Sequence, residues 1–287
     1  MNIGEYSLHS IVTSKFGLDG GAMFGIIPKP LWEKQIPADE NNRIQMVTRS
    51  LVLISDKRTI LIDTGNGAKW TEKFKNIYEI DTETVNLKQS LLQVGLGTED
   101  ITDVICTHLH FDHVGGNTEY QNGKVVPVFS NAMYWIHEEN WKLANSPGEK
   151  DQGSFMEADW KILAEKNMIR LVKSSQAHVS RDQLFQGIDI LVSNGHTTGQ
   201  ILPLIYDENH TLLYCADLIP TSAHIPIPWI MAYDIQPLVT IKEKHEVLSQ
   251  AVVNNWILFF EHDAAIEACT VRFDGKHYQK DRDITLS

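Results

Sequence analysis

Four potential metal ligands lie within six residues of this chain: His108, His110, Asp112 and His113. Because His108 and His110 are two positions apart, an extended segment turns both imidazoles to one side, whereas Asp112 and His113 are adjacent and point in different directions. One short stretch can therefore serve two neighbouring metal ions. Imidazole and carboxylate ligands suit Zn²⁺ and also Mn²⁺, Fe²⁺ or Co²⁺, since ligand type alone does not select among these ions. The pattern predicts metal-dependent hydrolytic chemistry.

Six residues cannot complete two coordination spheres, so further ligands must come from elsewhere in the chain. Three candidates each follow a short apolar, β-prone run: His196 after residues 188–192, Asp217 after 211–216 and His262 after 256–260. The first cluster likewise follows Val104-Ile105-Cys106. Strand-like runs that end in a ligand are typical of a site built at the strand ends of a sheet. A single histidine in such a place is more often structural, but the repeated pattern favours ligands.

The motif HxHxDH, followed by His, Asp and His in that order, makes the chain resemble the metallo-β-lactamase superfamily. The resemblance implies an α/β fold, a four-layer αβ/βα sandwich, and two divalent metal ions per chain, with zinc favoured. It also implies the distribution of the ligands: one ion bound by His108, His110 and His196, the other by Asp112, His113 and His262, and Asp217 bridging both.

Asp63 is a further feature of the resemblance. It lies in Leu61-Ile62-Asp63-Thr64-Gly65, at the end of a strand that a turn at Asp56-Lys57-Arg58 joins to residues 51–54. In relatives this aspartate supports the ligands and does not bind metal. On local grounds a turn-capping role is equally compatible with the sequence.

A narrower resemblance lies in residues 20–32 and 229–234, which are similar to YtnP-like N-acyl-homoserine lactonases and, more distantly, to methyl parathion hydrolase. Metal binding does not require Met23, Phe24 or Trp32 in the first of these segments. They are candidates for an apolar wall that binds substrate, or for a contact in a homodimer. The alternative is a packing role, which aromatic and Met side chains usually have.

Two positions depart from the relatives. Many relatives carry a second histidine four residues after the one that matches His196, where this chain has Gln200. Some lactonases place a tyrosine three residues after the bridging aspartate, where this chain has Pro220. His224 is the nearest residue able to replace that tyrosine as a catalytic and substrate-binding donor, although a solvated loop histidine is an equal alternative.

Length and composition are those of a compact enzyme. No linker or charge block divides the 287 residues, so we expect one domain (1–287) with an N-terminal loop extension (about 15–40) and a helical insertion (about 134–173). The net charge is −12, and Lys and Arg are scattered, which argues against a nucleic acid partner.

The chain shows no signal peptide and no apolar run long enough for a membrane span, so we expect a cytoplasmic protein that acts on a small molecule.

The three cysteines, Cys106, Cys215 and Cys269, are odd in number and lie in or beside apolar runs, which favours reduced, buried thiols. Cys215 shares a strand face with Asp217 and is a weak alternative ligand.

The resemblance implies a lactonase that opens N-acyl-homoserine lactones (quorum quenching) by attack of a metal-bridging hydroxide. Asp112 would accept the proton of the hydroxide and deliver it to the leaving oxygen. Two alternatives stay open. One is an organophosphate triesterase or arylesterase that uses the same metal pair. The other is a non-catalytic metal-dependent sensor or binding protein, against which the complete set of seven ligands counts.

Overall fold

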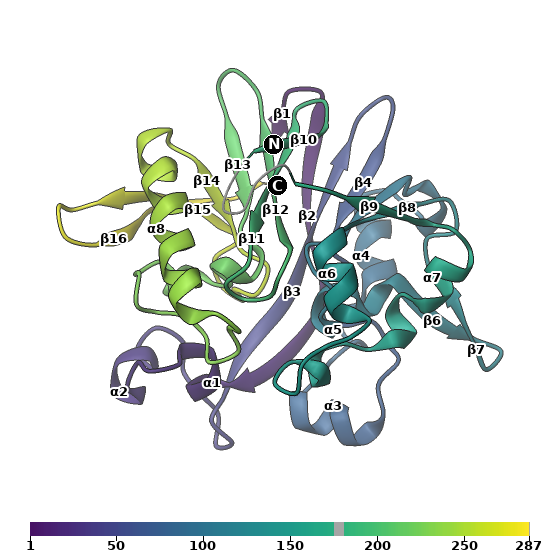
Figure 1. The fold of residues 1–287 in the computed structure, drawn as a ribbon, viewed down its shortest axis with the longest axis horizontal. Coiled ribbons are helices and arrows are strands. Elements are labelled where there is room, and N and C mark those ends of the chain that lie inside the picture. The colour runs from purple at the N-terminus through teal and green to yellow at the C-terminus, as the bar shows by residue number, and fades with distance from the viewer. Residues whose placement is uncertain (175–180, 287) are drawn as a thin grey trace. The chain divides into compact units, whose positions relative to one another are not determined.

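The computed structural model describes residues 1–174 and 181–286 and divides into two compact units. The first unit comprises Met1–Phe16 and Val47–Lys173, and the second comprises Gly17–Met46 and Ser174–Ser287. Each unit contains a seven-stranded sheet accompanied by helices (Figure 1). The predicted α/β class is confirmed.

The sheet of the first unit has the strand order β1-β2-β3-β4-β5-β8-β9. β3 and β4 form an antiparallel hairpin, closed by the turn predicted at Asp56–Arg58, and β4, β5, β8 and β9 are parallel. β4 and β5 are almost wholly buried, as expected for parallel strands covered on both faces. The strands are β1 Asn2–Ile3, β2 Tyr6–Asp19, β3 Arg43–Ile54, β4 Thr59–Ile62, β5 Asp103–Ile105, β8 Met133–His137 and β9 Ile169–Val172; β6 Thr118–Gln121 and β7 Lys124–Pro127 form a separate hairpin.

Side-chain caps start three helices of the first unit, with His137 as the cap of α6. The Thr71 side chain accepts a hydrogen bond from the Phe74 N–H, and the Asn86 side chain accepts one from the Gln89 N–H, which satisfies groups that a helix start leaves free. The helices are α3 Glu72–Tyr78, α4 Leu87–Gln93, α5 Phe111–Val114, α6 Glu138–Ala144 and α7 Lys161–Glu165, with 3₁₀ turns η1 Thr98–Asp100, η2 Gly115–Asn117, η3 Gln152–Ser154 and η4 Glu157–Asp159.

The sheet of the second unit has the strand order β10-β11-β12-β13-β14-β15-β16, antiparallel except for the parallel pair β13 and β14. α8 packs on this sheet beside β15 (Figure 1). The strands are β10 Asp182–Phe185, β11 Ile188–Ser193, β12 Gln200–Tyr206, β13 Thr211–Tyr214, β14 Ile257–Phe259, β15 Ala268–Phe273 and β16 Tyr278–Ile284. The helices are α1 Gly20–Phe24, α2 Lys29–Trp32 and α8 Pro237–Val253, with 3₁₀ turns η5 Ala216–Leu218 and η6 Ser222–His224. None of the helices in the described part of the chain is both long and apolar enough to cross a bilayer.

Two expected segments have other bounds in the structure. The range of about 134–173, expected to be a helical insertion, does contain α6, α7 and two 3₁₀ turns, but it begins within β8 and ends just after β9. The range of about 15–40, expected to be a loop extension, begins inside β2 and contains α1 and α2. Both segments are therefore integral parts of the two units.

Candidate metal centre

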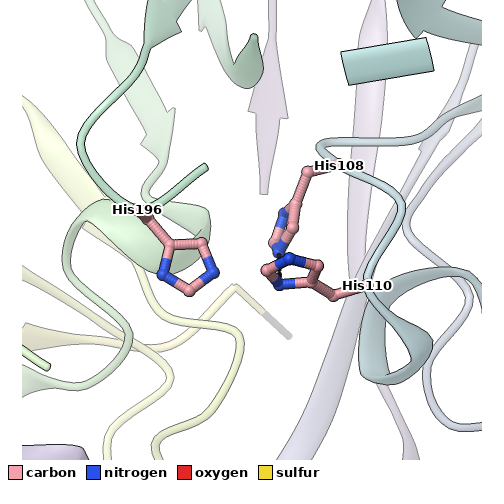
Figure 2. Close-up of side chains that lie close together, drawn as sticks. All are labelled: His108, His110 and His196. Atoms are coloured by element: carbon pink, nitrogen blue, oxygen red, sulfur yellow. Dashed lines mark hydrogen bonds between the residues drawn. The ribbon is translucent and has the colours of Figure 1, made fainter. Parts of the chain in front are cut away.

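The first group of predicted ligands lies where β5 ends. The chain leaves the sheet after Ile105, and α5 begins at Phe111 with His110 as its N-cap. His108 Nε2 lies 3.1 Å from His110 Nδ1 (Figure 2), and the rings of His108 and His113 have centroids 3.9 Å apart. The Asp112 carboxylate is 3.9 Å from His113 Nε2. The first unit thus brings three buried imidazoles and a buried carboxylate together within six residues, in the loop after β5 and the start of α5.

Asp63 stands behind one of these imidazoles. It is fully buried, and its Oδ2 lies 3.0 Å from His113 Nδ1. The same carboxylate accepts hydrogen bonds from the Thr107 N–H at 2.7 Å and the Thr107 hydroxyl at 2.6 Å. Asp63 therefore orients His113 and also holds the loop that carries His108.

The second unit contributes another three predicted ligands, each at a strand end: His196 after β11, Asp217 after β13 and His262 after β14. One Asp217 oxygen lies 3.1 Å from His196 Nε2, and the other lies 3.1 Å from His262 Nε2. All three side chains are buried. A carboxylate whose two oxygens face two different imidazoles has the arrangement expected of a bridging ligand.

Asp234 repeats the role of Asp63 in the second unit. Its Oδ1 lies 3.1 Å from His196 Nδ1, the ring nitrogen opposite the one that faces Asp217. A carboxylate behind an imidazole fixes the tautomer and orientation of the ring, as it commonly does for histidines that bind metal. Asp234 lies in the segment 229–234, which resembles lactonases, but no role is predicted for it from the sequence.

The donor chemistry in each unit fits a divalent cation. Ionisable side chains are costly to bury unless they are paired or bind a metal, and here imidazoles and carboxylates are buried together. His113 and His196 each have a buried carboxylate on Nδ1, which leaves Nε2 as the nitrogen available for a cation. These nitrogen and oxygen donors match Zn²⁺ and the related ions named above.

Glu243 of α8 fixes the loop that leads to His196. Its fully buried carboxylate accepts hydrogen bonds from the Ser193 hydroxyl at 2.7 Å, the Asn194 N–H at 2.8 Å and the Gly195 N–H at 3.1 Å. Gly195 lies so close to Thr240 of the same helix that a Cβ atom would collide with it. The helix therefore sets the position from which His196 emerges.

Gln200 and Cys215 lie close to the second group of ligands in the chain. The fully buried Gln200 side chain accepts a hydrogen bond from the Asp217 N–H at 3.3 Å, so it supports the bridging candidate where many relatives carry histidine. The Cys215 thiol donates to the Leu213 carbonyl, and burial raises its pKa well above the ordinary value. A thiol held in the protonated form is a poor ligand. All three cysteines are free and buried, as predicted.

The residues proposed as a substrate wall lie inside the second unit. Met23, Phe24 and Trp32 are each at most 1% exposed. Phe24 stacks on Trp32, with centroids 5.3 Å apart, and on the ring of His224, with centroids 4.6 Å apart. In this structure the three side chains have the packing role that was the alternative to a wall.

His224 is also fully buried, with both ring nitrogens engaged. Nε2 lies 2.9 Å from the Met23 carbonyl, which can only accept, so Nε2 carries the hydrogen and Nδ1 accepts from the Thr221 hydroxyl at 2.7 Å. Burial lowers the pKa of His224 to about 4, so the ring is neutral. This geometry gives His224 a positioning role and leaves it no nitrogen for a substrate.

Lys244, the neighbour of Glu243, holds the loop after His224. Its fully buried ammonium lies 2.6 Å from the His224 carbonyl, 2.9 Å from that of Pro226 and 2.8 Å from that of Trp229. Neither Glu243 nor Lys244 is among the residues predicted for the site. A signal existed, because Glu243 and Lys244 precede the buried Val247 and Leu248 by one helical turn and so lie on the apolar face.

Comparison with known proteins decides the family. The family model of the metallo-β-lactamase superfamily matches residues 45–262, which is most of the chain and includes all seven predicted ligands. The chain belongs to this superfamily. The protein is therefore a metal-dependent hydrolase, and its buried His and Asp residues support the binding of divalent metal ions.

Individual relatives agree with this membership. The chain is 30% identical over 92 residues to metallo-β-lactamase domain-containing protein 1 of Xenopus laevis, a match that spans 31% of this chain and about a third (34%) of that protein. A probable metal-dependent hydrolase from Staphylococcus aureus is 28% identical, with a TM-score of 0.87 over 99% of this chain and 100% of that one. AidC, a dizinc quorum-quenching lactonase in complex with a product, N-hexanoyl-L-homoserine, is 20% identical, with a TM-score of 0.81 over 100% and 97% of the two chains.

Replacement of Glu243 by Gln should loosen the His196 loop. The amide offers one acceptor oxygen for three donors and turns an NH₂ group toward them, so we expect a loss of about 1–3 kcal/mol in the free energy of unfolding. Metal affinity, measured by competition with a chelator, should fall by about 10- to 100-fold. The control is Glu246→Gln in the same helix, where the carboxylate only pairs with Lys242 at the surface. Equal effects of the two substitutions would contradict the assigned role.

The buried neutral His224 should make stability depend on pH. Between its ordinary pKa of 6.5 and the folded value of about 4, the unfolded chain takes up a proton that the folded chain refuses. Stability is therefore lost as the pH falls through this window, by roughly 3 kcal/mol in total. Urea unfolding at pH 7.5 and pH 4 measures the free energy of unfolding at the two ends of this window. The loss should be larger for the natural protein than for His224→Gln, because the variant keeps the same carboxylates and lacks only the imidazole. Parallel losses would refute the assignment.

Proposed function

We propose that the seven predicted ligands form one dinuclear hydrolytic centre, in which Asp217 would serve as a ligand for both ions. His108, His110 and His196 would hold one ion, and Asp112, His113 and His262 would hold the other, with zinc as the first candidate. The observation that carries this proposal is the Asp217 carboxylate, whose two oxygens each face a different buried imidazole. Superfamily membership and the carboxylates behind His113 and His196 support it.

We further propose that the reaction is the opening of N-acyl-homoserine lactones. The similarity to AidC over the whole chain supports this substrate class, as do the sequence segments shared with lactonases. A metal pair, when bound, lowers the pKa of water toward about 7 and polarises the ester carbonyl.

The remaining work falls to residues of the chain. Asp112, buried beside His113, would take the proton released after attack on the carbonyl carbon and pass it to the ring oxygen that leaves as an alcohol. Asp63 and Asp234 would keep His113 and His196 in the tautomers that the centre needs. No thiol nucleophile is required, and burial raises the pKa of all three cysteines.

A side-by-side assay tests the substrate class. The metal-loaded protein should show its highest kcat/KM on N-acyl-homoserine lactones and lower values on paraoxon-type triesters, aryl esters, S-lactoylglutathione and a β-lactam. Protein stripped with a chelator serves as the control, and readdition of Zn²⁺ or Mn²⁺ should restore the rate. A triester that outperforms every lactone would replace the lactonase by the triesterase alternative.

Replacement of Asp112 by Asn tests the proton shuttle. The amide can still occupy the site but cannot carry the proton, so turnover should fall on the order of 10² to 10⁴. Elemental analysis should find close to two ions per chain in the natural protein and most of them in the variant. The exposed Asp100→Asn in the same unit is the control. Full metal content with near-normal turnover in Asp112→Asn would show that the proton travels by another route.

A further inference from the structure

A cavity of about 740 Å³ opens within the second unit. This volume lies in the range of small-molecule sites. Its lining is largely apolar and includes Ile36, Pro37, Ile225, Pro226, Trp229 and Ile266. None of the functions derived above uses this cavity.

The loops of two predicted ligands form one wall of the cavity. The His262 N–H donates to the Pro220 carbonyl at 3.1 Å, which ties the His262 turn to the loop that follows Asp217. The next residue along the chain, Asp263, accepts hydrogen bonds from Ser222, from its N–H at 2.9 Å and its hydroxyl at 2.6 Å. Because Ser222 and Asp263 both line the cavity, its wall and the ligand loops are one structure.

The charged side chains that line the cavity already have hydrogen-bond or ion-pair partners within the protein. Asp263 also accepts from the N–H groups of Ala265 at 2.9 Å and Ile266 at 2.7 Å, so its carboxylate has four donors. Lys280 pairs with Asp283 at 2.7 Å. These are the charged side chains among the described residues that line the cavity. An uncharged, apolar occupant therefore fits better than an ion.

Trp229 is the aromatic side chain that reaches the cavity from the buried cluster. Its ring lies edge-on to Phe24, with centroids 5.6 Å apart at 86°, and its carbonyl is held by Lys244. Phe24 is closed in behind it by Trp32 and His224. These contacts fix the position of the half-buried indole. Phe24 does not line the cavity itself and can influence it through its contact with Trp229.

We propose that this cavity binds the alkyl part of the acyl chain of the substrate and that Trp229 determines the preferred chain length. The proposal rests on the proposed lactonase function for the identity of the chain. The alternative occupant of an apolar cavity of this size is a second copy of the protein.

Two variants and one control test the proposal. Trp229→Ala removes the indole, and Ala265→Trp fills the cavity from an exposed position; Val253→Trp, at the 82% exposed end of α8, adds the same side chain elsewhere. On the metal-loaded natural protein, kcat/KM for acyl-homoserine lactones should rise about fourfold for each added methylene that becomes buried. Trp229→Ala and Ala265→Trp should flatten this rise, whereas Val253→Trp should keep it.

A binding measurement gives a second readout that needs no hydrolysis. Decanamide, an uncharged chain without a lactone, should change the tryptophan fluorescence saturably, and the change should disappear in Trp229→Phe. Butyramide should bind far more weakly. A decanamide response without lactone hydrolysis would overturn the proposed function and retain the cavity as a site for apolar chains.

Lactone hydrolysis that is independent of chain length, with no decanamide response, would overturn the cavity proposal and leave the lactonase intact. The same conclusion would follow if Ala265→Trp changed only the sedimentation coefficient of the protein. That result would show that the cavity is an interface between copies.

Discussion

A carboxylate removed from water must be surrounded by hydrogen-bond donors, and this requirement organises both units of the chain. Asp63 meets it with Thr107 and His113, one oxygen of Asp234 meets it with His196, and Glu243 meets it with the turn before His196. In each case the donors belong to a predicted ligand or to the loop that carries one. The buried charge and the position of the ligand therefore depend on each other, and neither can be changed alone.

The places of the candidate ligands at strand ends could be predicted because their signal is local. His108 to His113 form a compact pattern, and His196, Asp217 and His262 each follow an apolar run that the structure shows as a strand. The hairpin of β3 and β4 was equally readable, since its turn stands between two β-prone runs. Such features need only a few neighbouring residues, and periodicity reveals them.

The contacts of Glu243 and His224 could not be predicted because their partners are remote in the chain. Glu243 contacts Ser193 across 50 positions, and His224 contacts Met23 across 201 positions. A Glu-Lys pair in the middle of a helix normally indicates a solvated surface, and the one sign against it here is the spacing of one helical turn from Val247 and Leu248. The role of Phe24 stayed open between a substrate wall and packing because an aromatic residue at a wall and one packed behind it have the same sequence signal; the structure shows Phe24 fully buried.

The adjacent charges of α8 constrain how the helix can change over evolution. Successive residues of a helix point about 100° apart, so Glu243 and Lys244 reach two different loops from one stretch of backbone. An insertion or deletion of a single residue between Thr240 and Glu243 would rotate both side chains away from their loops at once. Length variation among homologues is therefore expected beyond the ends of α8, before Pro237 or after Val253, and not within its first two turns.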